Sequence, residues 1–198
     1  MKFGVCLIVL VFLAHGAAGA TEEPTLLKTV SPLPVALDPD FQFRKTKLFL
    51  MTEKAPNSAK DKSNKKGGSA DGTGNAQSST AKSTSVVQEA SITFERQYRL
   101  FGAVTKLDQH QRFGNYFDFF WRTKRPADLT ARLEYRQEKL HAHIQAQEIS
   151  YHNVHGSHKT EFKVVGDDYF DNGRVLAWRC VLVENGKIVA ETQSYLWD

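Results

Sequence analysis

The sequence predicts an all-β domain of antiparallel strands packed as a β-sandwich. Short segments alternate apolar and polar residues, turn residues separate them, and no segment after the first twenty residues carries a credible helical pattern. The clearest element is the closing hairpin, residues 173–198, where Asn185 and Gly186 separate two apolar runs. Asn-Gly favours a two-residue type I′ turn, because both residues tolerate a positive φ. We therefore expect the other strands to pack around this hairpin.

Residues 1–20 have the composition of a secretory signal peptide. Lys2 precedes an apolar run from Val5 to Ala14, and the small residues Ala-Gly-Ala follow at 18–20. The run is shorter than the roughly 20 residues of a transmembrane helix, so we expect cleavage after Ala20 and no stable membrane span afterwards. The protein is therefore predicted to be secreted or periplasmic.

Cleavage would leave Cys180 as the single cysteine, because Cys6 lies inside the apolar run. An intramolecular disulfide is then excluded, and the domain must depend on its hydrophobic core. Cys180 lies in a strand near Trp178, where a cysteine usually behaves as a small buried hydrophobe. We expect Cys180, Trp178 and Trp121 to be core residues.

The net charge of +4 comes from one segment of the chain. Of the 26 basic and 22 acidic residues, residues 54–86 together with Lys2 hold seven and two, which leaves 19 and 20 elsewhere. A nucleic-acid-binding domain should carry a basic folded surface. The sequence therefore predicts no nucleic-acid partner.

Residues 21–40 are predicted to form a Pro-rich extended arm, because four prolines are spaced too closely for a helix or a central strand. The arm either packs on the domain through its apolar residues or forms a flexible spacer. Residues 41–51 then alternate as a strand with Phe41, Phe43 and Phe49 on one face.

Residues 54–85 contain no large apolar side chain, so they have nothing to bury and are expected to be disordered. The segment 54–87 is either an interdomain linker or a loop inserted into one domain, residues 41–198. We prefer the insertion, because an isolated 41–51 strand would expose its phenylalanines and long loops cost little extra closure entropy.

The remaining strands are expected at 92–104, 113–122, 129–137, 143–151 and 158–165, and residues 166–172 turn the chain into the closing hairpin. Together with the 41–51 strand and the hairpin, this makes about 7–8 strands. The central Trp121, the Tyr169 before the penultimate strand and the closing hairpin resemble immunoglobulin-like and fibronectin-III-like sandwiches. The resemblance covers residues 41–198 loosely, lacks the paired cysteines of antibody domains and implies no function.

No nucleophile motif for hydrolysis is present. Ser157 and His158 are adjacent, but neighbouring residues on a strand point to opposite faces and cannot share a proton. We therefore expect no catalysis and no cofactor.

Two groups of residues are weak candidates for metal binding. Histidines suit zinc or copper, and five of them fall close together in the sequence: His141, His143, His152, His155 and His158. Aspartate oxygens suit calcium, and the 167–173 loop contains Asp167, Asp168 and Asp171. The loop departs from the EF-hand spacing, and turn formation is the preferred interpretation of its aspartates.

Aromatic pairs facing outward, Tyr116 with Phe120 or Tyr195 with Trp197, would form a platform for sugars or peptides. The sequence therefore predicts an exported, non-catalytic module with a binding or structural role and a protein or carbohydrate partner. One alternative is a metal-dependent enzyme or metal-binding protein that uses the His141–His158 cluster or the Asp167–Asp171 loop. Another is an assembly subunit that pairs through an edge strand.

Overall fold

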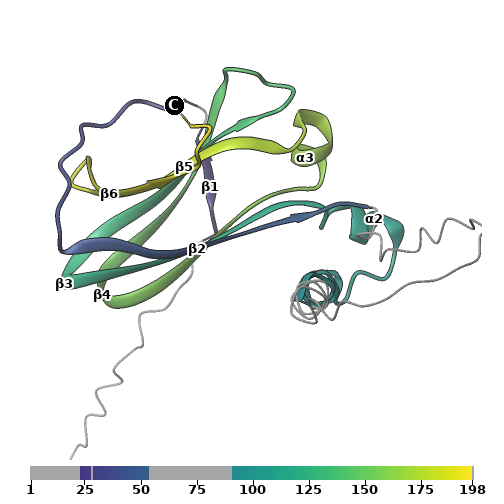
Figure 1. The fold of residues 1–198 in the computed structure, drawn as a ribbon, viewed down its shortest axis with the longest axis horizontal. Helices are drawn as coiled ribbons and strands as arrows, with labels where there is room; N and C mark the ends of the chain where they lie inside the picture. The colour runs from purple at the N-terminus through teal and green to yellow at the C-terminus, as the bar shows by residue number, and fades with distance from the viewer. Residues whose placement is uncertain (1–22, 28, 54–90, 198) are drawn as a thin grey trace, which may run out of the picture.

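The computed structural model describes residues 23–27, 29–53 and 91–197. Six strands in these residues form one antiparallel sheet, in the order β1-β4-β3-β5-β6, with β2 also paired to β3 (Figure 1). Their bounds are β1 Thr25–Leu27, β2 Phe41–Met51, β3 Gly114–Gln137, β4 Ile144–Val165, β5 Val175–Glu184 and β6 Lys187–Gln193. The all-β class is confirmed. The described strands form one sheet that does not close, and a sandwich is not confirmed.

β3 and β4 form the long central pair of the sheet, from Gly114 opposite Val165 to Arg136 opposite Ile144. Each strand joins two segments that the sequence analysis treated as separate strands, and this is a correction. Pro126, which has no N–H to donate, lies where the pairing shifts between Thr123 and Leu129. Such a shift bends a strand without ending it.

β2 and β5 pair with the same edge of β3, on opposite sides of this bend. β2 covers the first half of β3 up to Thr123, and β5 covers the second half from Thr130. The sheet therefore splits and curls around one core, to which every strand except β1 contributes. The core contains Trp121, Trp178 and Cys180, as predicted.

The closing hairpin is confirmed. Asn185 and Gly186 adopt φ values of 50° and 73°, and Glu184 pairs with Lys187 across the turn.

The expectation that no helix follows the predicted signal peptide is wrong. Residues 91–100 are helical where a strand was predicted, and α2 (Lys106–His110) and α3 (Asp167–Asn172) are short helices. Phe94 and Tyr98 fit alternation, but they also stand four residues apart, which places them on one helical face. Among the described residues, none of the helices has the length and apolar composition of a membrane span.

The described part of the Pro-rich arm is tethered. β1 pairs with β4, and further on the Ala36 N–H donates to the Ile188 carbonyl oxygen (2.8 Å) and the Asp38 N–H to that of Val189 (2.9 Å). The arm thus runs along part of the β6 edge. The predicted signal peptide, residues 1–20, and the predicted insertion, residues 54–87, lie outside the described residues.

Candidate functional site

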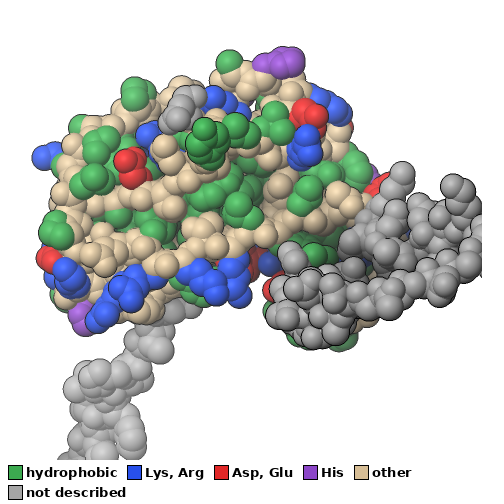
Figure 2. Space-filling view, in the orientation of Figure 1, with side chains coloured by type: hydrophobic (Ala, Val, Ile, Leu, Met, Phe, Trp, Pro, Cys, Tyr) green, Lys and Arg blue, Asp and Glu red, His purple; other side chains and the backbone are tan. Residues whose placement is uncertain are grey.

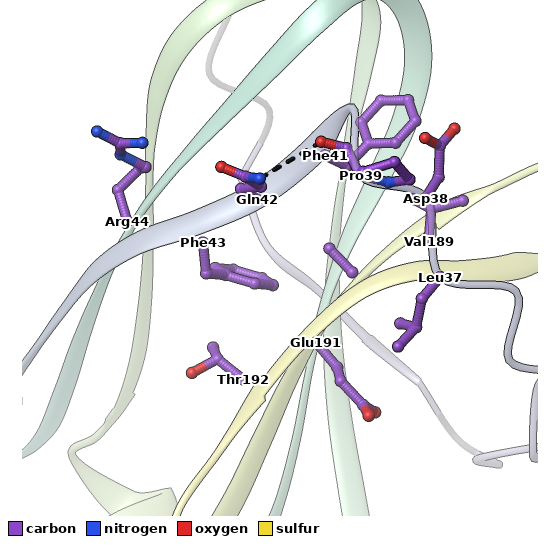
Figure 3. A pocket seen from close by; sticks show the side chains of 11 residues that line it. Leu37, Asp38, Pro39, Phe41, Gln42, Phe43, Arg44, Val189, Glu191 and Thr192 are labelled. Carbon is purple, nitrogen blue, oxygen red and sulfur yellow. Dashed lines mark hydrogen bonds between the residues drawn. The ribbon is translucent and has the colours of Figure 1, made fainter.

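A groove of about 760 Å³ lies between β2 and β6, where the curled sheet stays open (Figure 3). The arm, β2 and β6 line it with Leu37, Asp38, Pro39, Phe41, Gln42, Phe43, Arg44, Val189, Ala190, Glu191 and Thr192. The arm lies along β6 at one end, and the other end is bordered by Arg44 and Thr192.

The floor of the groove is the edge of the hydrophobic core. Phe41, Val189 and Ala190 are buried members of the core cluster. Phe43 points from β2 into the groove, and its ring meets that of Phe119 edge to face with centroids 6.1 Å apart (Figure 3). A ligand side chain that entered here would contact apolar surface already packed against the core.

The walls of the groove are strand edges. In an antiparallel ladder, alternate residues direct their N–H and C=O groups away from the neighbouring strand. Within the described residues β2 has a single neighbouring strand, β3, so its other edge faces the groove. The arm occupies the β6 edge at Ile188 and Val189. The rest of the β6 edge, toward Thr192, also faces the groove.

A charged cluster holds one end of the groove in place. The Arg125 guanidinium, at the bend of β3, contacts the carboxylates of Glu184 and Asp38 and lies 4.6 Å from the centre of the Phe41 ring. The Asp40 N–H donates to Asp38, and this bond and Arg125 hold the pKa of the Asp38 carboxyl below its usual range. The hydrogen bonds from Arg125 to Glu184 and Asp38 raise the pKa of the guanidinium. This cluster fixes β2, β3 and β5 where the groove begins.

The five candidate histidines fall into two separate groups. His141 and His143 belong to the turn between β3 and β4, whereas His152, His155 and His158 lie in the middle of β4. At roughly 3.3 Å per residue, the distance from His143 to His152 along a strand is about 30 Å. The sequence neighbours therefore do not converge as one set.

Each histidine of the second group has its own local contact. His158 stacks on Trp121 at 4.7 Å, with Nε2 3.1 Å from the His155 carbonyl oxygen, and His152 Nδ1 lies 3.8 Å from an Asp128 carboxylate oxygen. Within the described residues, no three His, Cys, Asp or Glu side chains gather as a metal site would need.

The candidate aspartates belong to α3 and not to an open turn. Asp167 and Asp168 lie in its first turn, and Asp168 accepts a hydrogen bond from the Asn172 side chain at 3.2 Å. Asp171 lies one turn further along the same helix. The turn interpretation is therefore corrected to a short helix.

The two predicted aromatic platforms are not present as pairs. Tyr116 and Trp197 are buried, and the Trp197 ring has Arg136 and Arg179 within 4.9 and 5.5 Å of its centre. The Phe120 ring lies near two lysines, Lys47 at 5.7 Å and Lys159 at 5.9 Å. Tyr195 is exposed, but without its predicted partner.

The sequence analysis did not identify the groove. It placed Phe41, Phe43 and Phe49 on one face of a strand, and the structure confirms this for Phe41 and Phe43, which lie toward the core. Phe49 is a correction, because the pairing of β2 shifts between Phe43 and Lys45 and turns Phe49 to the opposite face, where it packs with Tyr116. Local alternation also carries no signal for β6 as the opposite wall of the groove. No family model matches this chain, no curated protein matches it, and no solved structure matches it.

Proposed function

We propose that this protein is an exported, non-catalytic binding module that holds an extended polypeptide segment in the groove between β2 and β6. The observation that carries the proposal is the open sheet, in which two strand edges face each other across an apolar floor. An added strand gains affinity from backbone hydrogen bonds and specificity from alternate side chains. Because β2 and β6 approach within 8 Å of each other, the bound segment would pair with one of the two edges and lie over the groove, not between the strands.

The groove dimensions suit a short extended segment. Its β2 wall runs from Phe41 to Arg44, and four residues of strand span about 13 Å at ~3.3 Å each. Alternate side chains of the ligand would meet Phe43 and Ala190 at the floor, and the others would face solvent. We therefore expect a ligand with apolar residues at every second position.

The chemistry of the lining supports binding over catalysis. Among the lining residues there is no Ser, Cys, His or Tyr, and the carboxylate of Asp38 is engaged by Arg125. The groove thus has no imidazole to activate its one hydroxyl, that of Thr192, and its second carboxylate, Glu191, is exposed to solvent. Pairing through an edge strand, which the sequence analysis gave as an alternative, is the binding mode that this proposal adopts.

Two predictions from the sequence have no supporting contact. They are the immunoglobulin-like or fibronectin-III-like sandwich and the carbohydrate partner.

The test begins with selection from a displayed library of peptides that carry apolar residues at alternate positions. Fluorescence anisotropy then measures the affinity of the selected peptides. We expect Phe43→Lys to weaken binding by tenfold or more, about 1.4 kcal/mol, because a charge would enter the apolar floor. The matched control is Leu48→Lys, which adds the same charge at an exposed position of β2 outside the groove. Failure to select any peptide, or equal affinity in Phe43→Lys and wild type, would overturn the proposal.

A further inference from the structure

The outer face of the sheet, turned away from the core, carries a group of cations where β2, β3 and β4 pair. The register places Lys45 of β2, Phe120 of β3 and Lys159 of β4 in one row across the three strands. Paired residues share a face of the sheet. The ammonium groups of Lys47 and Lys159 accordingly lie 5.7 and 5.9 Å from the centre of the Phe120 ring. Arg122 follows two residues after Phe120 and therefore stands on the same face.

Arg44 connects this group of cations to the groove. It lies where the pairing of β2 with β3 shifts, between Phe43 and Lys45. In Figure 3 the Phe43 ring points into the groove, whereas Arg44 points to the other side of β2. We call Arg44, Lys45, Lys47 and Arg122 the cationic face; all four residues are exposed. Figure 2 shows Lys and Arg side chains along the lower edge of the described surface, where Figure 1 places β2, β3 and β4.

The carboxylates on this side of the sheet are paired with other cations. Three carboxylates contact three cations at distances of 3.1 to 3.5 Å, namely Asp118, Glu161 and Glu95 with Lys159, Lys163 and Arg99. These six charges balance one another. In the part of the chain that the structure describes, none of the four residues of the cationic face forms an ion pair. Their positive charges are therefore not neutralised within the fold.

Protection of a sheet edge explains only part of the cationic face. Exposed lysines on an edge strand discourage pairing with other chains, which accounts for Lys45 and Lys47 of β2. Arg122 lies in β3 between two paired strands, opposite Gln42 and Ser157, where no edge needs protection. Residues 54–86 are a poor cover, because they hold six lysines against two aspartates. Two copies that met through this face would bring like charges together, so charge complementarity favours an anionic partner.

The position of the cationic face beside the groove narrows this partner to a polypeptide. A segment that pairs along β2 leaves the groove at Arg44, and its continuation reaches the other side of the strand there. Neighbouring strands lie about 4.8 Å apart, so about four extended residues, ~13 Å, reach from β2 to β4. Acidic side chains fit this continuation and not the groove itself, because Asp38 and Glu191 already line the groove.

We propose that the polypeptide bound in the groove carries a run of aspartates or glutamates beside its alternating apolar residues. The apolar residues lie in the groove, and the acidic run lies on the cationic face, where its carboxylates pair with Lys45, Lys47 and Arg122. This inference rests on the proposed function and adds the charge of the partner to it. Opposite charges also raise the rate at which protein and partner associate.

The test compares peptides that share one groove sequence, taken from the display selection, and differ only in a tail of glutamates or of glutamines. Fluorescence anisotropy at low ionic strength should show roughly tenfold tighter binding with the glutamate tail, because several exposed ion pairs add together. The gain should disappear as salt is raised, since salt screens exposed charges. The variant Lys45→Gln/Lys47→Gln/Arg122→Gln should lose the gain, bind the glutamine-tailed peptide as the wild type does, and keep its thermal midpoint.

The matched control is Lys106→Gln/Lys139→Gln/Lys187→Gln, which removes the same charge from exposed residues elsewhere and should keep the gain. Three results would overturn the inference and leave the groove proposal intact. They are equal affinity for the two tails, equal loss of the gain in both variants, and tighter binding of a single-stranded oligonucleotide that only the first variant weakens. If neither peptide binds, the proposed function fails, and the inference fails with it.

Discussion

Arg125 and Glu184 form a two-point ion pair, in which each terminal nitrogen of the guanidinium lies 2.7 Å from one oxygen of the carboxylate. Arg125 belongs to the bend of β3, and Glu184 ends β5. The same guanidinium reaches Asp38 of the arm at 3.2 Å. One side chain therefore joins three segments at the end of the groove.

Replacing Arg125 by Lys should lower the thermal midpoint and weaken peptide binding in the groove. Lysine keeps the charge but lacks the planar fork that bonds both carboxylate oxygens at once. The neighbouring Lys124→Met is the matched control, since Lys124 is more exposed and has one longer ion pair, to Asp40 at 3.6 Å. Equal midpoints for the two variants would show that the two-point geometry contributes nothing to stability.

Tyr135 should make the protein lose stability in alkali. Burial raises the pKa of the Tyr135 hydroxyl to about 12, and the nearby Asp168 carboxylate adds to the shift. The folded state thus keeps a proton that the unfolded state releases above its ordinary value near 10. The contribution is complete below about pH 10 and is lost as the pH rises toward about 12. Denaturant unfolding across this interval measures it, and Tyr135→Phe should flatten the decline.

Trp178→Ala should destabilise the domain by roughly 3–5 kcal/mol, the range for large-to-small changes at buried aromatic positions. The Trp178 ring packs against Phe119 with centroids 5.4 Å apart and against Phe117 at 6.2 Å. Tyr195→Ala is the control and should change the free energy of unfolding by less than about 0.5 kcal/mol, because Tyr195 is exposed. Urea unfolding of both variants gives the comparison.

Cys180 should resist thiol reagents in the native protein. It is fully buried, and burial raises the pKa of its thiol well above the ordinary value, so little reactive thiolate forms. Labelling should become rapid only in denaturant. Fast labelling of the native protein would contradict the buried position.

Cleavage of the backbone between Lys54 and Lys82, at an engineered protease site, should leave the two fragments associated. β2 precedes this segment and β3 follows it, and the two strands pair from Phe41 opposite Thr123 to Met51 opposite Gly114. Size-exclusion chromatography under native conditions checks the association. Separation of the fragments would favour an interdomain linker over an insertion.

Local patterns in the sequence determined the all-β class, the closing hairpin and the burial of Trp121, Trp178 and Cys180. These features depend on neighbours within a few residues: Asn185-Gly186 sets its own turn, and alternation sets which side of a strand is apolar. The same signals failed at residues 91–100, because Phe94 and Tyr98 fit a strand and a helix equally well. Only packing of Arg99 against Tyr116 and Glu161 distinguishes the two.

Tertiary structure alone decided where the candidate sites lie. The groove exists because β3 bends near Pro126 and brings β2 opposite β6, two strands that are far apart in the sequence. The histidines show the opposite case. His143 and His152 are close in sequence but lie far apart in space, because the strand between them is extended. Sequence patterns report the conformation of neighbours, whereas a binding site depends on which distant segments the curled sheet brings together.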